Sequence, residues 1–168
     1  MKKIFTAILG GVAAMLGIAL LSLGQSMNAG WQLLMAPFGA TAVLLFAAPL
    51  SPFSKTLNVI GGHLLTATIG LLFAEYIDFG SWTVAVATGL AIALMVITNT
   101  LHPPAGANPI LIIQSQQGWT FLMEPVLLGA IGLVISAKVF EKMKVYFHQY
   151  KRLKTPDSQE ASSPKKAF

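Results

Sequence analysis

The sequence predicts an all-α integral membrane protein, a compact bundle of six helical membrane segments. Composition is the first indication: the chain is 55% hydrophobic and only 10% charged, with a mean hydropathy of +0.70, whereas soluble domains have about 25% charged residues. Long apolar stretches recur between residues 4 and 140, several of them near the roughly 20 residues that a transmembrane helix needs. Turns rich in proline, glycine and serine separate these stretches.

The segments follow one another along the chain. Full-length segments are expected at residues 4–23, 31–48, 57–77, 82–101 and 121–140, and a half-length one at 105–113. The first run is longer than the roughly 7–15 apolar residues of a signal peptide, so we interpret it as a retained span. The last segment should continue as a charged helix to residue 150. Residues 1–150 then form the transmembrane domain, and residues 151–168 a disordered cytoplasmic tail.

The distribution of lysine sets the expected topology. Lys2 and Lys3 begin the chain, most other basic residues follow residue 137, and only Lys55 lies between. Positive residues stay on the cytoplasmic side, so both termini should be cytoplasmic. Six crossings also place Lys55 inside. If residues 31–48 and 105–113 are re-entrant instead, four spans remain and Lys55 falls outside. Nucleic-acid binding is a poorer explanation of this charge.

An internal repeat is visible when the chain is aligned with itself so that Pro37 falls on Pro104. Gly39 then falls on Gly106, Ala40 on Ala107 and Gly62 on Gly129, among eight identities without a gap. The predicted units are residues 4–78 and 81–148, with three segments each. An odd number of crossings per unit makes the two halves inverted, an arrangement that many transporters use.

A proline-broken patch at residues 102–109 is the main candidate site. Pro103 and Pro104 suit the first turn of a new helix, which would leave the amides of Ala105, Gly106 and Ala107 free to bind an anion. By the repeat, Pro37 begins a matching helix in which Gly39 matches Gly106 and Thr41 takes the place of Asn108. The alternative is that these residues only allow short helices to cross closely.

Three ordered motifs resemble the HPP family of integral membrane proteins, over roughly residues 31–140. They are Ala36-Pro37-Phe38-Gly39-Ala40-Thr41, Asn58-Val59-Ile60-Gly61-Gly62-His63 and His102-Pro103-Pro104-Ala105-Gly106-Ala107. The family is regarded as transporters, and some relatives are associated with nitrite, so the resemblance implies a small inorganic anion, nitrite first. Two departures are Thr56-Leu57, where the family often has Pro-Arg, and Asn108-Pro109 in place of small residues.

The remaining polar residues complete the candidate site. His63 and His102 can carry a proton near neutral pH, Asn99 and Asn108 can donate to an anion, and Asn58 is a helix cap or, by the resemblance, a ligand. The predicted substrate-binding set is His102, Pro103, Pro104, Ala105, Gly106, Asn108, Asn99, Pro37, Gly39, Thr41, Asn58 and His63. We expect no metal, because no third ligand accompanies the two histidines, and no cofactor. The absence of cysteine excludes thiol chemistry.

These observations favour proton-coupled transport of a small anion across a bacterial cytoplasmic membrane, by a protein that could work as a homo-oligomer. A structural or regulatory subunit of a membrane complex is the first alternative. A membrane-embedded enzyme is the second, and it is disfavoured because the sequence offers no Ser–His–Asp set and no paired buried carboxylates.

Overall fold

The computed structural model describes residues 2–27, 32–80 and 82–154, and all regular elements in those ranges are helices, with no β-strand among them. The chain divides into two compact units, residues 1–137 and 138–168. The elements are α1 (Lys2–Met27), α2 (Pro37–Ala42), the π-helix η1 (Val43–Ala47), the 3₁₀-helix η2 (Pro52–Ser54), α3 (Thr56–Tyr76), α4 (Thr83–Ile97), the 3₁₀-helix η3 (Pro103–Ala107), α5 (Asn108–Gln114), the π-helix η4 (Leu122–Leu127) and α6 (Leu128–Lys154). The all-α prediction is confirmed.

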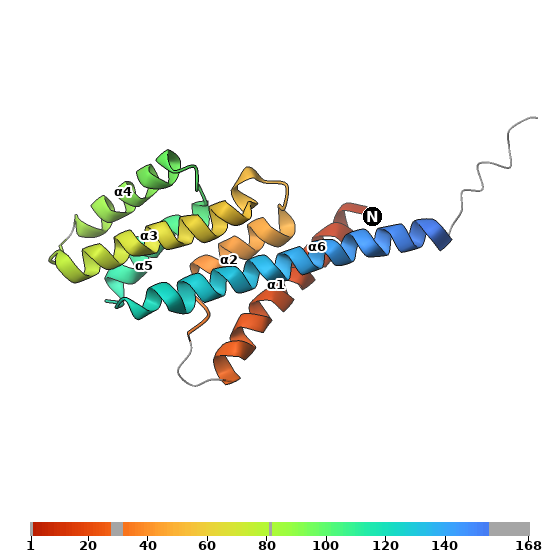
Figure 1. Ribbon diagram of the computed structural model, residues 1–168, viewed down its shortest axis with the longest axis horizontal. Helices are drawn as coiled ribbons and strands as arrows, with labels where there is room; N and C mark the ends of the chain where they lie inside the picture. The colour runs from red at the N-terminus through yellow and green to blue at the C-terminus, as the bar shows by residue number, and fades with distance from the viewer. Residues whose placement is uncertain (1, 28–31, 81, 155–168) are drawn as a thin grey trace, which may run out of the picture. The chain divides into compact units, whose positions relative to one another are not determined.

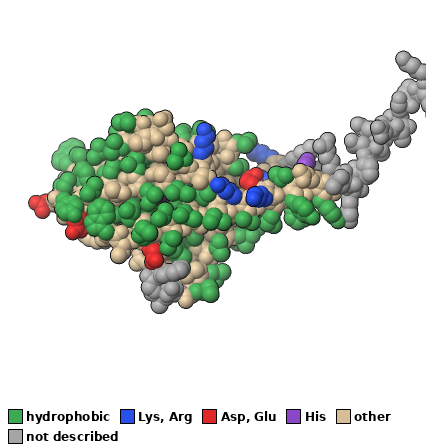
Figure 2. All heavy atoms as spheres, viewed as in Figure 1, with side chains coloured by type: hydrophobic (Ala, Val, Ile, Leu, Met, Phe, Trp, Pro, Cys, Tyr) green, Lys and Arg blue, Asp and Glu red, His purple; other side chains and the backbone are tan. Residues whose placement is uncertain are grey.

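Three helical segments are long and apolar enough to cross a membrane, namely residues 3–27, 56–76 and 122–150. They correspond to the first, third and last predicted segments. Their outward faces are apolar: Ile4, Phe5 and Leu57, for example, are each about two thirds exposed. Figure 2 shows hydrophobic side chains spread widely over the face in view, interspersed with uncharged polar and backbone atoms, and only a few charged side chains. Such a surface is suited to lipid and not to water.

The second and fourth predicted segments are shorter than expected. In the second, residues 32–36 are not helical and helix begins at Pro37, the start that the repeat predicted, because proline fits the first helical turn but not the interior. The fourth, α4, is 15 residues long and ends at Ile97 instead of residue 101. It ends there because Asn99 adopts a left-handed backbone with φ of 56°, and the Thr100 amide donates back to the Met95 carbonyl at 2.9 Å, as at many helix C-termini.

Helix α3 lies at the centre of the first unit, with α4 and α5 packed against it and against each other (Figure 1). A buried cluster of Ile69, Ala87, Ala91 and Ile113 joins these three helices. The short helix α2 with η1 lies against α1, and α2 also contacts η3. The two segments that begin with proline, α2 and η3, are therefore neighbours inside the unit.

Two glycines permit very close approach of non-helical chain to a long helix. A methyl group on Gly62 of α3 would lie 2.8 Å from the Thr100 carbonyl oxygen and 2.9 Å from the His102 Cβ. A methyl group on Gly129 of α6 would lie 2.6 Å from the Leu33 carbonyl oxygen. Because a side chain at either position would collide with backbone, only glycine fits there. The Gly62 contact fixes the broken segment at residues 98–102 onto α3.

The second unit contains the part of α6 from residue 138 onward. Lys144 forms an ion pair with Glu141 at 2.8 Å and lies 5.3 Å from the ring centre of Phe140. The predicted charged helix to residue 150 is present and continues to Lys154. Of the predicted tail, residues 155–168 lie outside the described residues.

Candidate functional site

Four polar side chains from separate segments meet inside the first unit. Thr41 comes from α2, His63 from about two turns into α3, His102 from the residue before η3, and Asn108 from the start of α5. All four are 0% exposed. We call this group the polar cluster. Its members are far apart in sequence, so only the packing of the short helices against α3 assembles it.

Hydrogen bonds connect the polar cluster into one chain. Thr41 Oγ1 lies 2.9 Å from His63 Nε2 and 3.0 Å from His102 Nε2. Asn108 Nδ2 lies 3.1 Å from His63 Nδ1, and His102 Nδ1 lies 2.9 Å from the Phe53 carbonyl oxygen. The imidazole rings are 5.0 Å apart between centroids. Every ring nitrogen of the two histidines therefore has a protein partner.

The two ends of this chain fix the direction of every bond within it. An amide nitrogen only donates, so His63 Nδ1 must accept and the proton of a neutral His63 is on Nε2. A carbonyl oxygen only accepts, so His102 Nδ1 must carry a proton, and Nε2 of a neutral ring accepts. Thr41 consequently accepts from His63 and donates to His102. The orientation of the Asn108 amide is set independently, because Nδ2 also lies 3.1 Å from the His63 carbonyl oxygen and 3.0 Å from Thr66 Oγ1. Its two hydrogens are therefore shared among three acceptors.

Further contacts hold the break in place beside the polar cluster. Asn58 Nδ2 donates to the Leu101 carbonyl at 2.9 Å, which satisfies a backbone group that no helix covers. Asn58 is thus a support for the break and not the cap of α3, whose N-cap position is Lys55. Pro109 and Ile112 of α5 pack within 3.2 Å of a methyl position on Gly70. Gly62 and Gly70 of α3 therefore allow the break and α5, respectively, to pack closely against this helix.

A groove runs along the outside of the polar cluster. Its volume is about 600 Å³, and it is lined by Ala36, Pro37, Ala40, Pro103, Pro104, Ala107, Ile110, Leu111, Gln114 and Ser115. Two of these residues adjoin the polar cluster directly: Pro103 follows His102, and the Pro37 carbonyl lies 3.3 Å from Thr41 Oγ1. Prolines of both short segments therefore form the wall of the groove, next in sequence to His102 or in contact with Thr41.

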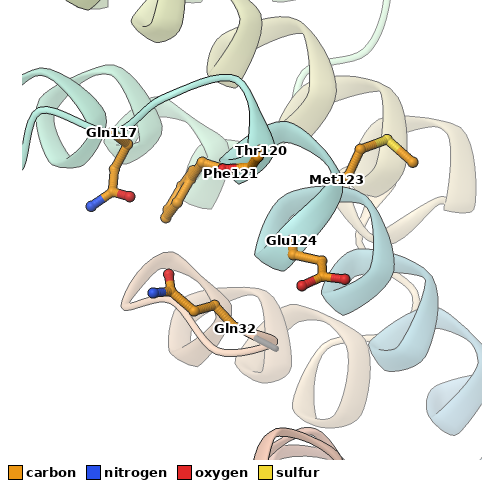
Figure 3. Close-up of a pocket in the computed structure, with 6 residues that line it drawn as sticks. All are labelled: Gln32, Gln117, Thr120, Phe121, Met123 and Glu124. Atoms are coloured by element: carbon orange, nitrogen blue, oxygen red, sulfur yellow. The ribbon is translucent and has the colours of Figure 1, made fainter. Parts of the chain in front are cut away.

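A second hollow of about 440 Å³ lies elsewhere in the first unit, lined by Gln32, Gln117, Thr120, Phe121, Met123 and Glu124. In Figure 3 the two glutamine side chains lie on opposite sides of the opening, and the Glu124 carboxylate lies near the segment that carries Gln32. A carboxylate in the wall repels an anion, and no basic side chain lines this hollow. The groove beside the polar cluster is thus the better anion site of the two.

The structure brings together most of the predicted site residues. Thr41, His63, His102 and Asn108 form the polar cluster, Asn58 supports the break, and Pro37, Pro103 and Pro104 line the groove. Gly106 is half-buried in η3, beside the buried Ala105. Two residues stay apart. Asn99 is exposed at the end of α4, where its role is the left-handed turn, and Gly39 is exposed, with no atom within 4 Å of the place a methyl group would take.

The prediction of free amides at the helix starts is wrong for Ala105. Its N–H donates to the His102 carbonyl at 2.9 Å, because a 3₁₀ turn pairs each amide with the carbonyl three residues earlier. The start of α2 behaves alike: the Phe38 amide donates to the Met35 carbonyl at 3.0 Å and the Gly39 amide to the Ala36 carbonyl at 3.1 Å. An anion would have to be attracted by something other than these backbone donors.

Sequence reasoning missed two members of the hydrogen-bonded chain. Phe53 contributes only its carbonyl, for which no side-chain signal exists. Thr66 has the sequence context of a simple helix-contact residue, yet it accepts from Asn108 and donates to the Gly62 carbonyl at 2.9 Å. Its spacing of three residues from His63 places both on one face of α3, which is a usable signal. Among the described residues no group of three or more His, Asp or Glu side chains could hold a metal.

Comparisons with known proteins agree with the membrane character of the chain. The transmembrane region of the HPP family matches residues 1–150. Two proteins of Dictyostelium discoideum, both described as transmembrane proteins, are 32% identical over 139 residues and 30% identical over 114 residues, which is 78% and 63% of this chain. The chain spans 49% and 37% of their lengths, about half or less. No solved structure matches the chain.

Proposed function

The chain belongs to the HPP transmembrane family, and from that premise we propose that it transports a small inorganic anion, nitrite first, across a membrane together with a proton. The family resemblance supplies the class of substrate. We propose as its place the groove between the proline-initiated segments, and the polar cluster next to this groove supports that choice.

The observation that carries the proposal is a buried polar cluster with protonatable rings and no fixed charge. From residue 4 to residue 137 the only basic residue besides histidine is Lys55, which is exposed. A permanent cation at membrane depth would be costly and would hold a monovalent anion strongly. A histidine can instead supply a positive charge that comes and goes with its proton. Binding that depends on such a charge is reversible, as transport requires.

The size and lining of the groove suit a small, partly hydrated ion. Its 600 Å³ exceeds the roughly 30 Å³ that one water occupies by a wide margin, so an anion could enter with water around it. Gln114 and Ser115 provide polar groups at one end, whereas the prolines and alanines along the wall offer no competing charge. Selectivity would therefore come from charge pairing and size more than from a fixed set of ligands.

We further propose that the transmembrane domain consists of two inverted repeats with six membrane segments. The contacts of Gly62 and Gly129 support this. The repeat alignment places these glycines on each other, and each faces the carbonyl oxygen of a residue in the other half, Thr100 and Leu33, which the same alignment also pairs. Thr41 and Asn108 are related by the same shift and both contact His63. A bacterial cytoplasmic membrane location, cytoplasmic termini and a homo-oligomeric state remain predictions from the sequence.

Uptake into sealed proteoliposomes tests the proposal. Nitrite, nitrate, formate and chloride are compared at two external pH values, with protein-free liposomes as background. We expect nitrite uptake that increases when the external side is more acidic, and a loss of at least about tenfold in His102→Ala, the change expected from a positioned acid–base group. His148→Ala is the matched control, because His148 is exposed in the second unit.

Two outcomes would overturn the proposal. One is uptake of all four anions at the background rate by folded wild-type protein. The other is equal uptake by His102→Ala, His148→Ala and the wild type, which would place the pathway elsewhere. A chemical turnover by the detergent-solubilised protein, without any gradient, would favour the enzyme alternative.

A further inference from the structure

We propose that His102 is the residue that loads the transported proton, that the Thr41 hydroxyl rotates to accommodate it, and that His63 stays neutral throughout. This assignment rests on the proposed function, which leaves open which histidine carries the proton. It follows from the directions of the hydrogen bonds within the polar cluster and from a further acceptor beside Thr41, the Pro37 carbonyl oxygen.

The polar cluster can hold one added proton at His102 without losing a hydrogen bond. In the neutral state Thr41 donates to His102 Nε2 over 3.0 Å. A proton added to Nε2 turns this nitrogen into a donor, and the hydroxyl oxygen can accept it alongside the existing bond from His63, because it has two lone pairs. The hydroxyl hydrogen is then free to turn to the Pro37 carbonyl, 3.3 Å away. Each donor still has an acceptor after the change.

The same addition at His63 breaks contacts. The unprotonated nitrogen of His63 is Nδ1, and it faces the Asn108 amide nitrogen at 3.1 Å. A proton there would confront another donor. Turning the amide over would bring Oδ1 to the position 3.1 Å from the His63 carbonyl oxygen, where two acceptors repel. Asn108 therefore holds His63 in one neutral tautomer.

An imidazolium at His102 has no counter-ion in its surroundings. The elements packed around it are α2, α3, α4, η2, η3 and α5. Besides the two histidines, their titratable or charged residues are Lys55 at the N-cap of α3 and Glu75 and Tyr76 at its C-terminal end. All three are exposed. Glu124 of η4 lies at the other hollow. A buried charge without a partner is strongly disfavoured. An anion in the groove, next to Pro103 and Pro37, would supply the partner, so proton and anion stabilise each other's binding.

Nitrogen NMR on the full-length protein tests this assignment without relying on transport. With ¹⁵N-labelled histidine in micelles, the two ring nitrogens of a neutral imidazole give separate resonances that identify the tautomer. We expect the proton on Nε2 in His63 and on Nδ1 in His102. As the pH falls, only His102 should become doubly protonated, and nitrite should increase its protonated fraction more than an equal concentration of a non-transported anion. His148→Ala removes the third histidine signal and assists assignment.

Paired substitutions of Thr41 test the rotating hydroxyl. Thr41→Val keeps the shape and removes the hydroxyl, whereas Thr41→Ser keeps the hydroxyl. We expect Thr41→Val to lose the acid stimulation of nitrite uptake, about a tenfold effect for a buried group left without its partner, and Thr41→Ser to restore it. In NMR, Thr41→Val should also lose the nitrite-induced protonation of His102.

The results separate this inference from the proposed function. Protonation of His63 before His102, or acid-stimulated uptake in Thr41→Val equal to that of the wild type, would overturn the inference while transport stands. Absence of uptake by the wild type, with the NMR pattern as expected, would overturn the transport proposal and leave the proton assignment intact. If Thr41→Val does not fold, the NMR titration of the wild type still decides between the histidines.

Discussion

Replacing Gly62 by alanine should destabilise the protein, because the new methyl group has no space. It would lie 2.8 Å from the Thr100 carbonyl oxygen and 2.9 Å from the His102 Cβ, whereas non-bonded contacts are comfortable at about 3.5 Å. The segment at residues 100–102 would have to retreat by roughly 0.6 Å. Overpacking of this kind typically costs about 1–3 kcal/mol.

The same displacement reaches the polar cluster. His102 Nε2 lies 3.0 Å from Thr41 Oγ1, and a retreat of that size would weaken the bond or break it, at a further cost of about 1 kcal/mol. Alanine recovers about 0.5–1 kcal/mol through its better helix propensity. The expected net loss is therefore about 2 kcal/mol, with reduced nitrite uptake because His102 is moved.

Gly89→Ala is the matched control. Gly89 lies in the middle of α4, with no atom within 4 Å of its methyl position, so alanine there should be neutral or stabilising. Thermal unfolding followed by circular dichroism in micelles measures both variants. We expect Gly62→Ala to melt roughly 4–8 °C below Gly89→Ala, at about 2–4 °C for each kcal/mol. Equal melting temperatures would refute the reasoning about the close contact, and the wild-type rate of uptake in Gly62→Ala would refute its link to the site.

The other predictions concern the two asparagines, the groove and the topology. Asn108→Ala should abolish proton-coupled uptake and cost about 1–3 kcal/mol of stability by leaving His63 and Thr66 without their donor. Asn99→Gly should leave uptake unchanged and stability unaffected or improved, because glycine tolerates φ of 56°. If Asn99→Gly lost more uptake and more stability than Asn108→Ala, the assigned site would be contradicted. Ala107→Trp should block uptake by filling the groove, and Val43→Trp, on an exposed position outside it, should not; equal rates would exclude the groove as the pathway. In this cysteine-free chain, Lys55→Cys should react with a membrane-impermeant thiol reagent only from the cytoplasmic side, and labelling from outside would indicate four crossings.

Part of this arrangement was predictable from local sequence. The prolines at 37, 103 and 104 determine where the short helices begin, because proline is accepted in the first turn and rejected in the interior. The repeat predicted the helix start at Pro37 correctly, whereas the apolar run alone suggested a segment from residue 31. The same local reasoning indicated that the break needs partners from elsewhere in the protein, and Thr41 and Asn58 provide them; that the break is a substrate site stays a prediction.

Other features depended on distance in space. Asn99 and Asn108 look equally suitable as donors in the sequence, since both flank the break. The structure separates them. Asn99 itself adopts the left-handed conformation that follows α4, and it is exposed. Asn108 is buried against His63, because α5 packs on Gly70. The direction of the hydrogen-bonded chain could not be foreseen either, because one end is the backbone carbonyl of Phe53.

The sequence by itself determined the membrane class, the positions of the breaks and the identity of the residues able to carry a proton, since hydropathy and proline geometry act over a few residues. Only the tertiary structure decided which polar groups satisfy one another and which remain available. That pairing depends on helices approaching within hydrogen-bond distance across gaps of 22 to 61 residues, and glycines on α3 and α6 make this approach sterically possible.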